Sequence, residues 1–431
     1  MREHAPGGAL PGIRQEKLLL PAQVCGQFFS HRSLGDVVMK KSVVVSAVLV
    51  ANAFAAVAQA EPMEVALLQE AIFSGKTSLD LRLRGEYVDY ETSPETDAET
   101  LRTVLGYKTG DYHGLKAFIE FENVSTLGNG EYNSGTTGFG NNQTQYGLIA
   151  DPGLTQINQA LLEGYGVKFG RQKIIYDNAR FIGDVGWRQN DQTFDAISFS
   201  NATWVEGLTV NAALLKRVSN IYGVKRRVDA PLANLRYAKF PQAKVTAFYY
   251  AVDEEDAPTT SWQHAGVRVD GAIANFLYEL SYADQADYAE SKATAVPDVS
   301  YTDIQLGYKF GPVTLKAQQE VLEKGFKTPL ATLHAFNGWA DRFLATPANG
   351  LEDTNVKLQA TLGTYSFVLA GHDFRAEATN DKFGEEVDFS VSKPLTAKLT
   401  ALVKYAEFNG GSVAGFTNDT RKAWLQFAYK M

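Results

Sequence analysis

Short segments in which apolar and polar residues alternate run from Ser78 to the last residue of the chain. Residues 79–84, Leu-Asp-Leu-Arg-Leu-Arg, show the pattern clearly. A period of two places the apolar side chains on one face of a β-strand and the polar side chains on the other. Strands of about ten residues that alternate in this way over a whole chain are typical of transmembrane β-barrels.

The alternation predicts 18 strands, and 16 remain an alternative because the fourth and fifth segments alternate least clearly. The expected strands are 78–90, 98–109, 112–124, 155–163, 164–170, 191–200, 206–216, 231–240, 242–252, 263–271, 273–283, 299–310, 312–322, 353–362, 365–374, 383–392, 395–408 and 420–431.

Short and long connections alternate between these strands. The expected tight turns are centred on Asp111, Pro241-Gln242, Asp270-Gly271, Gly311-Pro312, Gly363-Thr364 and Lys393-Pro394. The expected long connections are 125–154, 171–190, 217–230, 284–298 and 322–352. Bacterial outer-membrane barrels have short periplasmic turns and long extracellular loops. We therefore predict an all-β fold, a transmembrane antiparallel up-and-down barrel of about 18 strands with both ends of the barrel chain in the periplasm.

A soluble β-sandwich or propeller is the main alternative, because it would also alternate apolar and polar positions. Three features favour the barrel: the export signal described below, the repetition of strands along the whole chain, and the regular alternation of short and long connections. Its apolar face would contact lipid, its polar face would line a lumen, and its backbone pairing would have to close.

The N-terminal region has the features of an export signal. Residues 39–60 combine a basic start, an apolar stretch and an Ala-Gln-Ala cleavage motif, which indicates a signal peptide rather than the alternative of a membrane anchor. Residues 1–38 have no coherent pattern and are interpreted as an upstream extension from a mis-assigned start. We expect a short periplasmic segment with helical spacing at 61–77 and the barrel at 78–431.

Composition narrows the function further. The single cysteine, Cys25, lies in the excluded part, so the mature chain has no disulfide or thiolate chemistry. Removing the six Lys or Arg and three Asp or Glu residues of 1–60 from the totals of 41 and 49 leaves a mature net charge of −11. A charge of this sign argues against nucleic acid as a partner.

Three stretches of the sequence together resemble the alginate-export family of outer-membrane porins. They are 101–124, which includes Phe-Ile-Glu-Phe-Glu-Asn-Val, then 170–195, which includes Gly-Trp-Arg-Gln-Asn-Asp, and 336–351, which begins Phe-Asn-Gly-Trp-Ala-Asp-Arg-Phe. The resemblance implies a monomeric barrel of 18 strands that acts as a passive conduit. In the alginate exporter of this family a strongly basic constriction conducts a polyuronate, and that arginine set cannot be matched here residue by residue.

Basic residues on the polar faces are the candidates for lining the pore and setting its selectivity. They are Arg82, Arg84, Arg102, Lys116, Lys168, Arg236, Arg268, Lys316, Lys357 and Lys404. A ring of such charges would favour anions. The alternative is that they pair with acidic residues of neighbouring strands and stiffen the wall. Arg82, Arg84 and Arg102 lie on one face of two adjacent strands, so we expect them to form a local cluster.

Two long loops carry a second group of candidates. They are Arg171, Arg180, Trp187, Arg188, Trp339, Asp341 and Arg342. Trp beside Arg can stack on sugar rings or bind carboxylates, and the alternative is that these residues anchor a folded loop.

Catalysis has little support, because the four mature histidines are widely separated and no hydrolase motif is present. No cofactor or metal is expected. The acidic run 253–256 could bind Ca²⁺, although a solvated charge run is the simpler interpretation. We predict an outer-membrane porin for small or oligomeric polar solutes, preferably anionic. The alternative is a barrel whose loops serve adhesion or receptor binding, and a barrel enzyme is a weaker one. The expected partners are outer-membrane lipid and lipopolysaccharide, the barrel-insertion machinery, which would read residues 424–431, and a small-molecule or oligosaccharide solute.

Overall fold

The computed structural model describes residues 62–135, 142–291 and 296–431. The predicted signal peptide at 39–60 and the extension at 1–38 lie outside the described residues. Contacts between Cα atoms divide the chain into two units, 1–66 and 67–431, and every strand lies in the second unit. No helix within the described ranges is long and apolar enough to cross a membrane.

In the described residues, one helix, 18 strands and two short 3-10 helices make up the regular structure. Their bounds are α2 (Pro62–Phe73), β1 (Lys76–Tyr90), β2 (Thr96–Lys108), β3 (Lys116–Leu127), β4 (Leu154–Gly164), β5 (Val167–Gln172), β6 (Thr193–Asn201), β7 (Leu208–Ser219), β8 (Lys225–Phe240), β9 (Ala243–Glu254), η1 (Pro258–Thr260), β10 (Trp262–Ile273), β11 (Phe276–Asp287), β12 (Val299–Phe310), β13 (Val313–Leu322), η2 (Leu333–Ala335), β14 (Leu351–Leu362), β15 (Tyr365–Arg375), β16 (Lys382–Pro394), β17 (Leu399–Gly410) and β18 (Thr420–Lys430).

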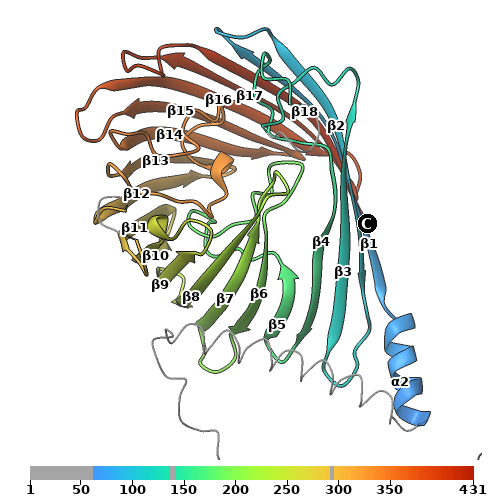
Figure 1. The fold of residues 1–431 in the computed structure, drawn as a ribbon. Coiled ribbons are helices and arrows are strands. Elements are labelled where there is room, and N and C mark those ends of the chain that lie inside the picture. Colours follow the sequence, from blue (N-terminus) through green and yellow to red (C-terminus); the bar gives the residue numbers. More distant parts are fainter. Residues whose placement is uncertain (1–61, 136–141, 292–295) are drawn as a thin grey trace, which may run out of the picture. The chain divides into compact units, whose positions relative to one another are not determined.

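The strands form one closed antiparallel sheet in sequence order. Each strand pairs with its neighbours in the chain, and β1 pairs with both β2 and β18. Figure 1 shows this succession of strands around the sheet. The prediction of 18 strands is confirmed, including the uncertain fourth and fifth strands, which are β4 and β5. A closed sheet has no unpaired edge, which is the condition for a β-structure in lipid.

The alternation along each strand sorts side chains as expected. On β1, Arg84 and Glu86 are buried, while Leu83, which precedes Arg84, is 42% exposed. On β17, Lys404 is buried and Val403 is 46% exposed. The apolar face is therefore the outer surface and the polar face lines the interior.

Three expected connections differ from the structure. Asp270-Gly271 lies within β10, and the β10–β11 turn is at Ala274-Asn275, where Ala274 has a positive φ of 52°. Lys393-Pro394 ends β16 instead of forming the next turn. The connection expected at 217–230 consists only of residues 220–224, because β8 begins at Lys225. The first residues of β8 are basic, and the sequence pattern predicts a loop for them. In the structure Arg226 and Arg227 lie in β8 and pair with Glu254 and Asp256 at the end of β9 and just after it.

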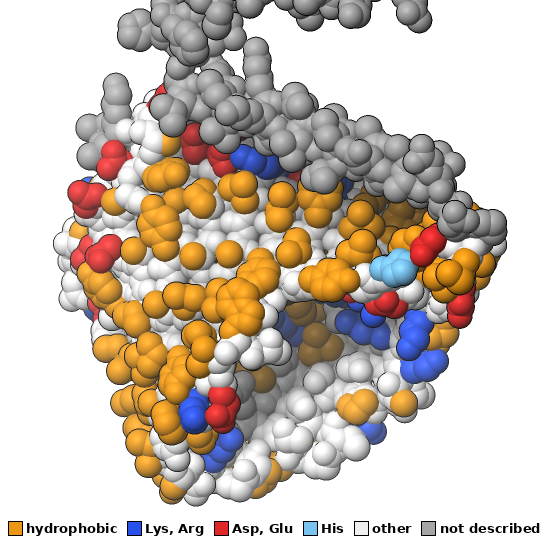
Figure 2. Space-filling view, turned by 90° about the horizontal axis from the view of Figure 1, so that it is seen from below, with side chains coloured by type: hydrophobic (Ala, Val, Ile, Leu, Met, Phe, Trp, Pro, Cys, Tyr) orange, Lys and Arg blue, Asp and Glu red, His pale blue; other side chains and the backbone are white. Residues whose placement is uncertain are grey.

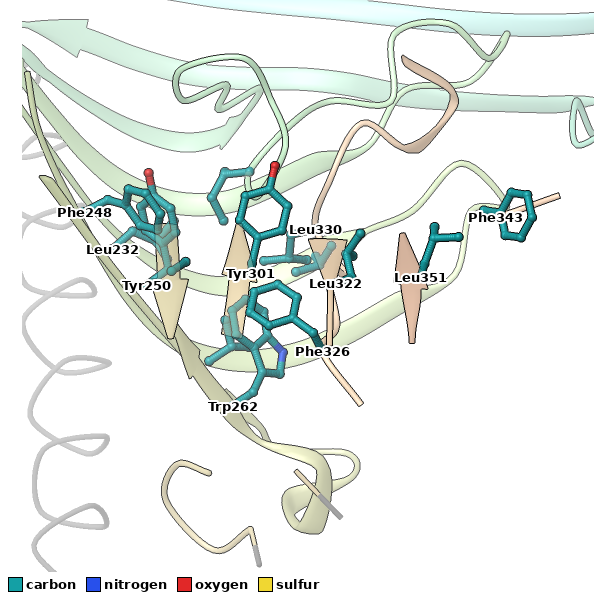
Figure 3. Packing of buried hydrophobic residues seen from close by; sticks show 14 of the residues in the cluster. Leu232, Phe248, Tyr250, Trp262, Tyr301, Leu322, Phe326, Leu330, Phe343 and Leu351 are labelled. Atoms are coloured by element: carbon teal, nitrogen blue, oxygen red, sulfur yellow. The ribbon is translucent and has the colours of Figure 1, made fainter. Parts of the chain in front are cut away.

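The short connections share one edge of the sheet, the turn end, and the longest loops share the opposite edge, the loop end. The β5–β6 loop (173–192) and the β13–β14 loop (323–350) contribute residues to a hydrophobic cluster inside the barrel. In this cluster Leu330 and Phe326 pack with the inward-facing Tyr301 and Trp262, as Figure 3 shows. The loop end is therefore filled by its own loops.

Candidate functional site

The two infolded loops are joined to each other by backbone hydrogen bonds. The amide of Gly183 donates to the carbonyl of Leu330 at 2.8 Å, and the amide of Thr332 donates to the carbonyl of Ala179 at 2.9 Å. Any solute that crosses the barrel must pass this combined structure. The residues that attach it to the wall form the candidate site.

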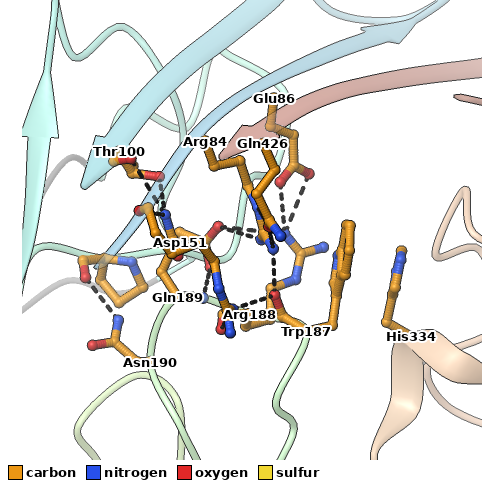
Figure 4. A network of polar contacts seen from close by, with 12 residues as sticks. Arg84, Glu86, Thr100, Asp151, Trp187, Arg188, Gln189, Asn190, His334 and Gln426 are labelled. Atoms are coloured by element: carbon orange, nitrogen blue, oxygen red, sulfur yellow. Dashed lines mark hydrogen bonds and ion pairs between the residues drawn. The ribbon is translucent and has the colours of Figure 1, made fainter. Parts of the chain in front are cut away.

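Two arginines of β1 hold the β5–β6 loop from the wall. Arg82 faces Arg102 directly across β1 and β2, so the expected cluster is present. The Arg82 guanidinium donates to the carbonyl oxygens of residues 186–188 at 3.0–3.2 Å. Arg84 donates to the carbonyl oxygen of Trp187 at 2.6 Å and stacks over its ring at 4.2 Å (Figure 4). Arg84 also pairs with Asp151, at 3.4 Å.

Arg102 is enclosed by carboxylates. Its Nε lies 2.9 Å from Glu122, and its Nη2 lies 2.6 Å from Asp191 of the β5–β6 loop. Lys173 also pairs with Asp191. Burial opposes ionisation of Asp191, but Lys173 and Arg102 outweigh it and lower the pKa of this carboxyl. This part of the wall is a balanced ionic cluster that fixes the base of the loop.

Lys404 of β17 enters an aromatic cage at the junction of the two loops. Its ammonium lies 4.2 Å from the centre of the Trp187 ring and 3.6 Å from that of Trp339. His334 stacks on Trp187 at 4.5 Å, and its Nε2 is 2.6 Å from the Lys404 Nζ. Because an ammonium can only donate, Nε2 accepts and Nδ1 carries the proton donated to Asp341, 2.6 Å away.

Asp341 is the point at which the β13–β14 loop meets the wall. Besides His334, it pairs with Arg188 at 2.6 Å and with Lys422 of β18 at 2.9 Å. Arg188 in turn pairs with Glu86 of β1. Burial opposes ionisation of Asp341, yet His334, Lys422 and Arg188 hold its pKa well below the usual value. Burial also lowers the pKa of His334 well below its usual value, so the imidazole is neutral.

The remaining loop candidates also contact other parts of this protein. The buried Arg180 pairs with Glu320 at 2.7 Å and stacks on Phe336. Arg342 donates to the carbonyl oxygen of Gly415 at 2.8 Å. Arg171 was expected in the loop, but it lies in β5, because β5 continues pairing with β6 as far as Gln172, and it points outward.

The other lumen candidates lie on inward-facing positions nearer the turn end. Arg236 pairs with Asp270 at 2.9 Å, and Arg268 pairs with Glu279 at 2.8 Å. Lys116 and Lys168 stand on either side of Glu163 in the register. Lys316 of β13 and Lys357 of β14 directly oppose each other. Lys316 donates to Gln305 at 2.8 Å, and within the described chain neither lysine forms an ion pair.

Cavities remain between the loops and the turn end. One of about 490 Å³ lies beside Arg82 and Arg102, one of about 370 Å³ beside Arg236 and Arg268, and one of about 290 Å³ beside Lys316. Figure 2 shows a hollow with Lys and Arg side chains, surrounded by an outer surface rich in hydrophobic side chains.

The sequence interpretation missed several residues of the site. They are Asp151, Asp191, Lys422 and Trp424. The inward-facing alternation of the last strand could have found Lys422 and Trp424. No local sequence pattern marks Asp151 and Asp191, because their partners are distant in the sequence.

The described residues contain no group of three or more His, Cys, Asp or Glu side chains that could hold a metal ion. In the acidic run 253–256, Glu254 pairs with Arg226 and Asp256 pairs with Arg227, each at 2.8 Å. These carboxylates therefore balance the basic start of β8.

A closed antiparallel sheet of 18 strands with an apolar outer face and a charged interior is the architecture of bacterial outer-membrane β-barrels. The alginate export family matches residues 150–322, which confirms the family resemblance over this part of the chain. The comparison with curated proteins found no match.

Solved structures of outer-membrane channels share the fold. OccK3 (OpdO) of Pseudomonas aeruginosa has a TM-score of 0.64 at 13% identity, with 86% of this chain and 99% of that chain covered. OccAB2 of Acinetobacter baumannii has a TM-score of 0.63 at 16% identity, with 84% and 99% covered. OccK8 (OprE) of P. aeruginosa has a TM-score of 0.62 at 13% identity, with the same coverage. Identities this low establish the fold alone.

Proposed function

We propose that this protein is a passive channel that conducts small or oligomeric polar solutes, with a preference for anions. In this proposal the loop end is extracellular and the turn end is periplasmic. The solute would pass between the infolded loops and the wall and then along the cavities near the turn end.

One observation carries the anion preference: near the turn end, the inner wall from β8 to β14 has an excess of positive charge, whereas the buried Asp303, Glu320 and Asp353 of the same wall lie nearer the loop end. Six basic residues lie in this turn-end part with three acidic residues. The basic residues are Arg236, Lys244, Arg268, Lys309, Lys316 and Lys357, and the acidic ones are Asp177, Asp270 and Glu279. Like charges that directly oppose each other across strands repel, so Lys316 and Lys357 are best satisfied by water or an anion. We call the six basic residues the basic strip.

The cavity beside β1 and β2 differs from the basic strip. Its basic residues are Arg82, Arg102, Lys173 and Lys430, and its acidic residues are Asp80, Glu120, Asp184 and Asp191. The formal charges cancel, and Arg102 is already surrounded by carboxylates. The basic strip is therefore the stronger candidate for attracting an anion, because at Lys316 and Lys357 a solute does not have to displace an ion pair.

Planar-bilayer recordings under a salt gradient test the proposal. We expect steady conductance and a reversal potential of anion-selective sign at low salt. Lys357→Gln should shift it toward cation preference, with a larger shift at about 0.01 M than at 1 M salt, where the Debye length falls from about 30 to about 3 Å.

Lys393→Gln is the matched control, because Lys393 packs over Tyr365, 4.6 Å from its ring, on the outer face near the turn end. Equal shifts in the two variants, or no shift in either, would show that the basic strip does not determine the ion selectivity. A barrel that assembles without conducting would overturn the channel itself.

A further inference from the structure

A row of charged side chains crosses the outer face of the barrel from β5 to β8. In the strand register Arg171 faces Asp195, Asp195 faces Arg217, and Arg217 faces Arg227. Each residue lies within two positions of the loop end of its strand. The row carries three guanidinium groups and one carboxylate, and we call it the arginine row.

The arginine row is accessible and only partly neutralised. The side chains of Arg217 and Arg227 are 43% and 60% exposed. Asp195 is shared, since it pairs with Arg171 at 2.8 Å and with Arg217 at 3.2 Å. Arg227 pairs with Asp256 at 2.8 Å and more distantly with Glu255 at 3.9 Å, and it still faces Arg217, a like charge. Directly opposed like charges are unfavourable unless a counter-ion lies between them.

An apolar row lies on the turn-end side of the arginine row, two positions away on β5 and β6 and three and four positions away on β7 and β8, where the ion pair of Lys216 and Asp229 lies between the two rows. It consists of Phe169, Ile197, Leu214 and Pro231, which face one another in the same register. Phe169 and Ile197 are 50% and 49% exposed. The outer face here thus places positive charge at the strand ends and exposed hydrocarbon just below, in the direction of the bilayer core.

The two rows match the chemistry of one kind of molecule. We propose that the arginine row binds a phosphorylated membrane lipid, with its phosphate on Arg217 and Arg227 and its acyl chains along the apolar row. Guanidinium groups bind phosphate through paired charge-assisted hydrogen bonds. Free phosphate would use only the charged half of this surface, whereas a lipid uses both halves. The inference concerns the outer surface, so it holds whichever solute the lumen conducts.

Another row on the outer face provides a contrast. At the loop end of β17, β18 and β1, Arg421 lies between Glu407 and Asp89. It pairs with Glu407 at 3.0 Å and with Asp89 at 3.7 Å. Two carboxylates and one guanidinium leave a negative excess, so this row should not attract a phosphate.

Native mass spectrometry of the purified barrel with lipid A, and with phosphatidylcholine as the reference lipid, tests the proposal. We expect lipid A to bind in preference, and the double variant Arg217→Gln/Arg227→Gln to reduce its occupancy at least fivefold. The double variant with Lys at both positions should fall between the two, because it keeps the charge and loses the paired geometry. Arg421→Gln should bind as the wild type does.

Unchanged lipid A occupancy in the Gln double variant would overturn the proposal. So would a wild-type dimer that the same substitutions convert to a monomer, since the row would then be an interface with a second copy. Arg227→Gln alone keeps the test decisive if the double variant does not assemble, because Arg227 is the most exposed member of the row. Its occupancy should also fall, and heat-modifiable migration on a gel verifies that each barrel is folded.

Discussion

At the scale of single residues, position along a strand determines which environment a side chain meets. Leu358 and Gln359 are consecutive in the middle of β14, and Leu358 is 40% exposed on the outer face. Gln359 lies on the opposite face, which it shares with Lys357. The alternation in the sequence is sufficient to make this assignment, because a period of two leaves only two faces.

The first prediction tests this assignment. Leu358→Arg should lower the free energy of unfolding in lipid by about 2–4 kcal/mol, because an arginine on the lipid face at the bilayer midplane must be desolvated. Gln359→Arg, its matched control, should change it by less than about 1 kcal/mol, since the lumen can hydrate the charge. Urea titration in vesicles measures both, and equal losses would show that the faces are wrongly assigned.

At the scale of elements, the infolded loops depend on a few buried contacts with distant strands. Asp341 connects the β13–β14 loop to Arg188 and to Lys422. The sequence pointed to Asp341, Trp187 and Arg188 as loop residues of interest. It could not show that they meet β1, β17 and β18, because those contacts depend on how the whole barrel closes.

The second prediction concerns this anchor. Asp341→Asn leaves Arg188 and Lys422 with one carboxylate fewer in a buried site, which should weaken docking of the β13–β14 loop by about 3–5 kcal/mol. Hydrogen exchange over residues 323–350 should rise, while the strands stay protected. Asp373→Asn, which removes a partly exposed ion pair with Arg375, should leave the exchange of the loop unchanged. Exchange that does not respond to Asp341→Asn would show that other contacts hold the loop.

The third prediction is that acid loosens the same loop. The pKa values of His334 and Asp341 are both lower in the docked loop than in a released one. A released loop therefore binds more protons, and docking weakens as pH falls. The loss should begin below about pH 6.5, where a free imidazole is protonated, and deepen below about pH 4. Single-channel recordings should show more frequent switching between conductance levels at pH 5.5 than at pH 7.5, and identical traces would contradict the prediction.

At the scale of the whole molecule, the sequence is sufficient to predict the strands of the sheet but not the contacts inside the barrel. Alternation located every strand because lipid imposes the same rule on each one. It misplaced the turn at Asp270-Gly271, since a turn-forming dipeptide can also continue a strand when its neighbours pair on both sides. It identified the basic residues of the lumen but could not show which of them a carboxylate already neutralises, because Asp151 and Asp191 come from loops without periodicity.

The last prediction follows from that distribution of charge. Replacing Arg82, Arg84 and Arg102 together with Gln removes three positive charges from the lumen and leaves Asp151, Glu122 and Asp191 without these partners. The reversal potential should shift toward cation preference at low salt, and the conductance should become noisier because the β5–β6 loop loses its contacts with the wall. Arg82→Gln alone should give a smaller shift and less added noise, because Arg84 and Arg102 still hold the loop through Trp187 and Asp191. Arg421→Gln, on the outer face, controls for a general loss of charge and should change neither quantity. An unchanged reversal potential in the triple variant would assign these arginines entirely to holding the loop and would leave the basic strip as the part of the lumen that selects the solute.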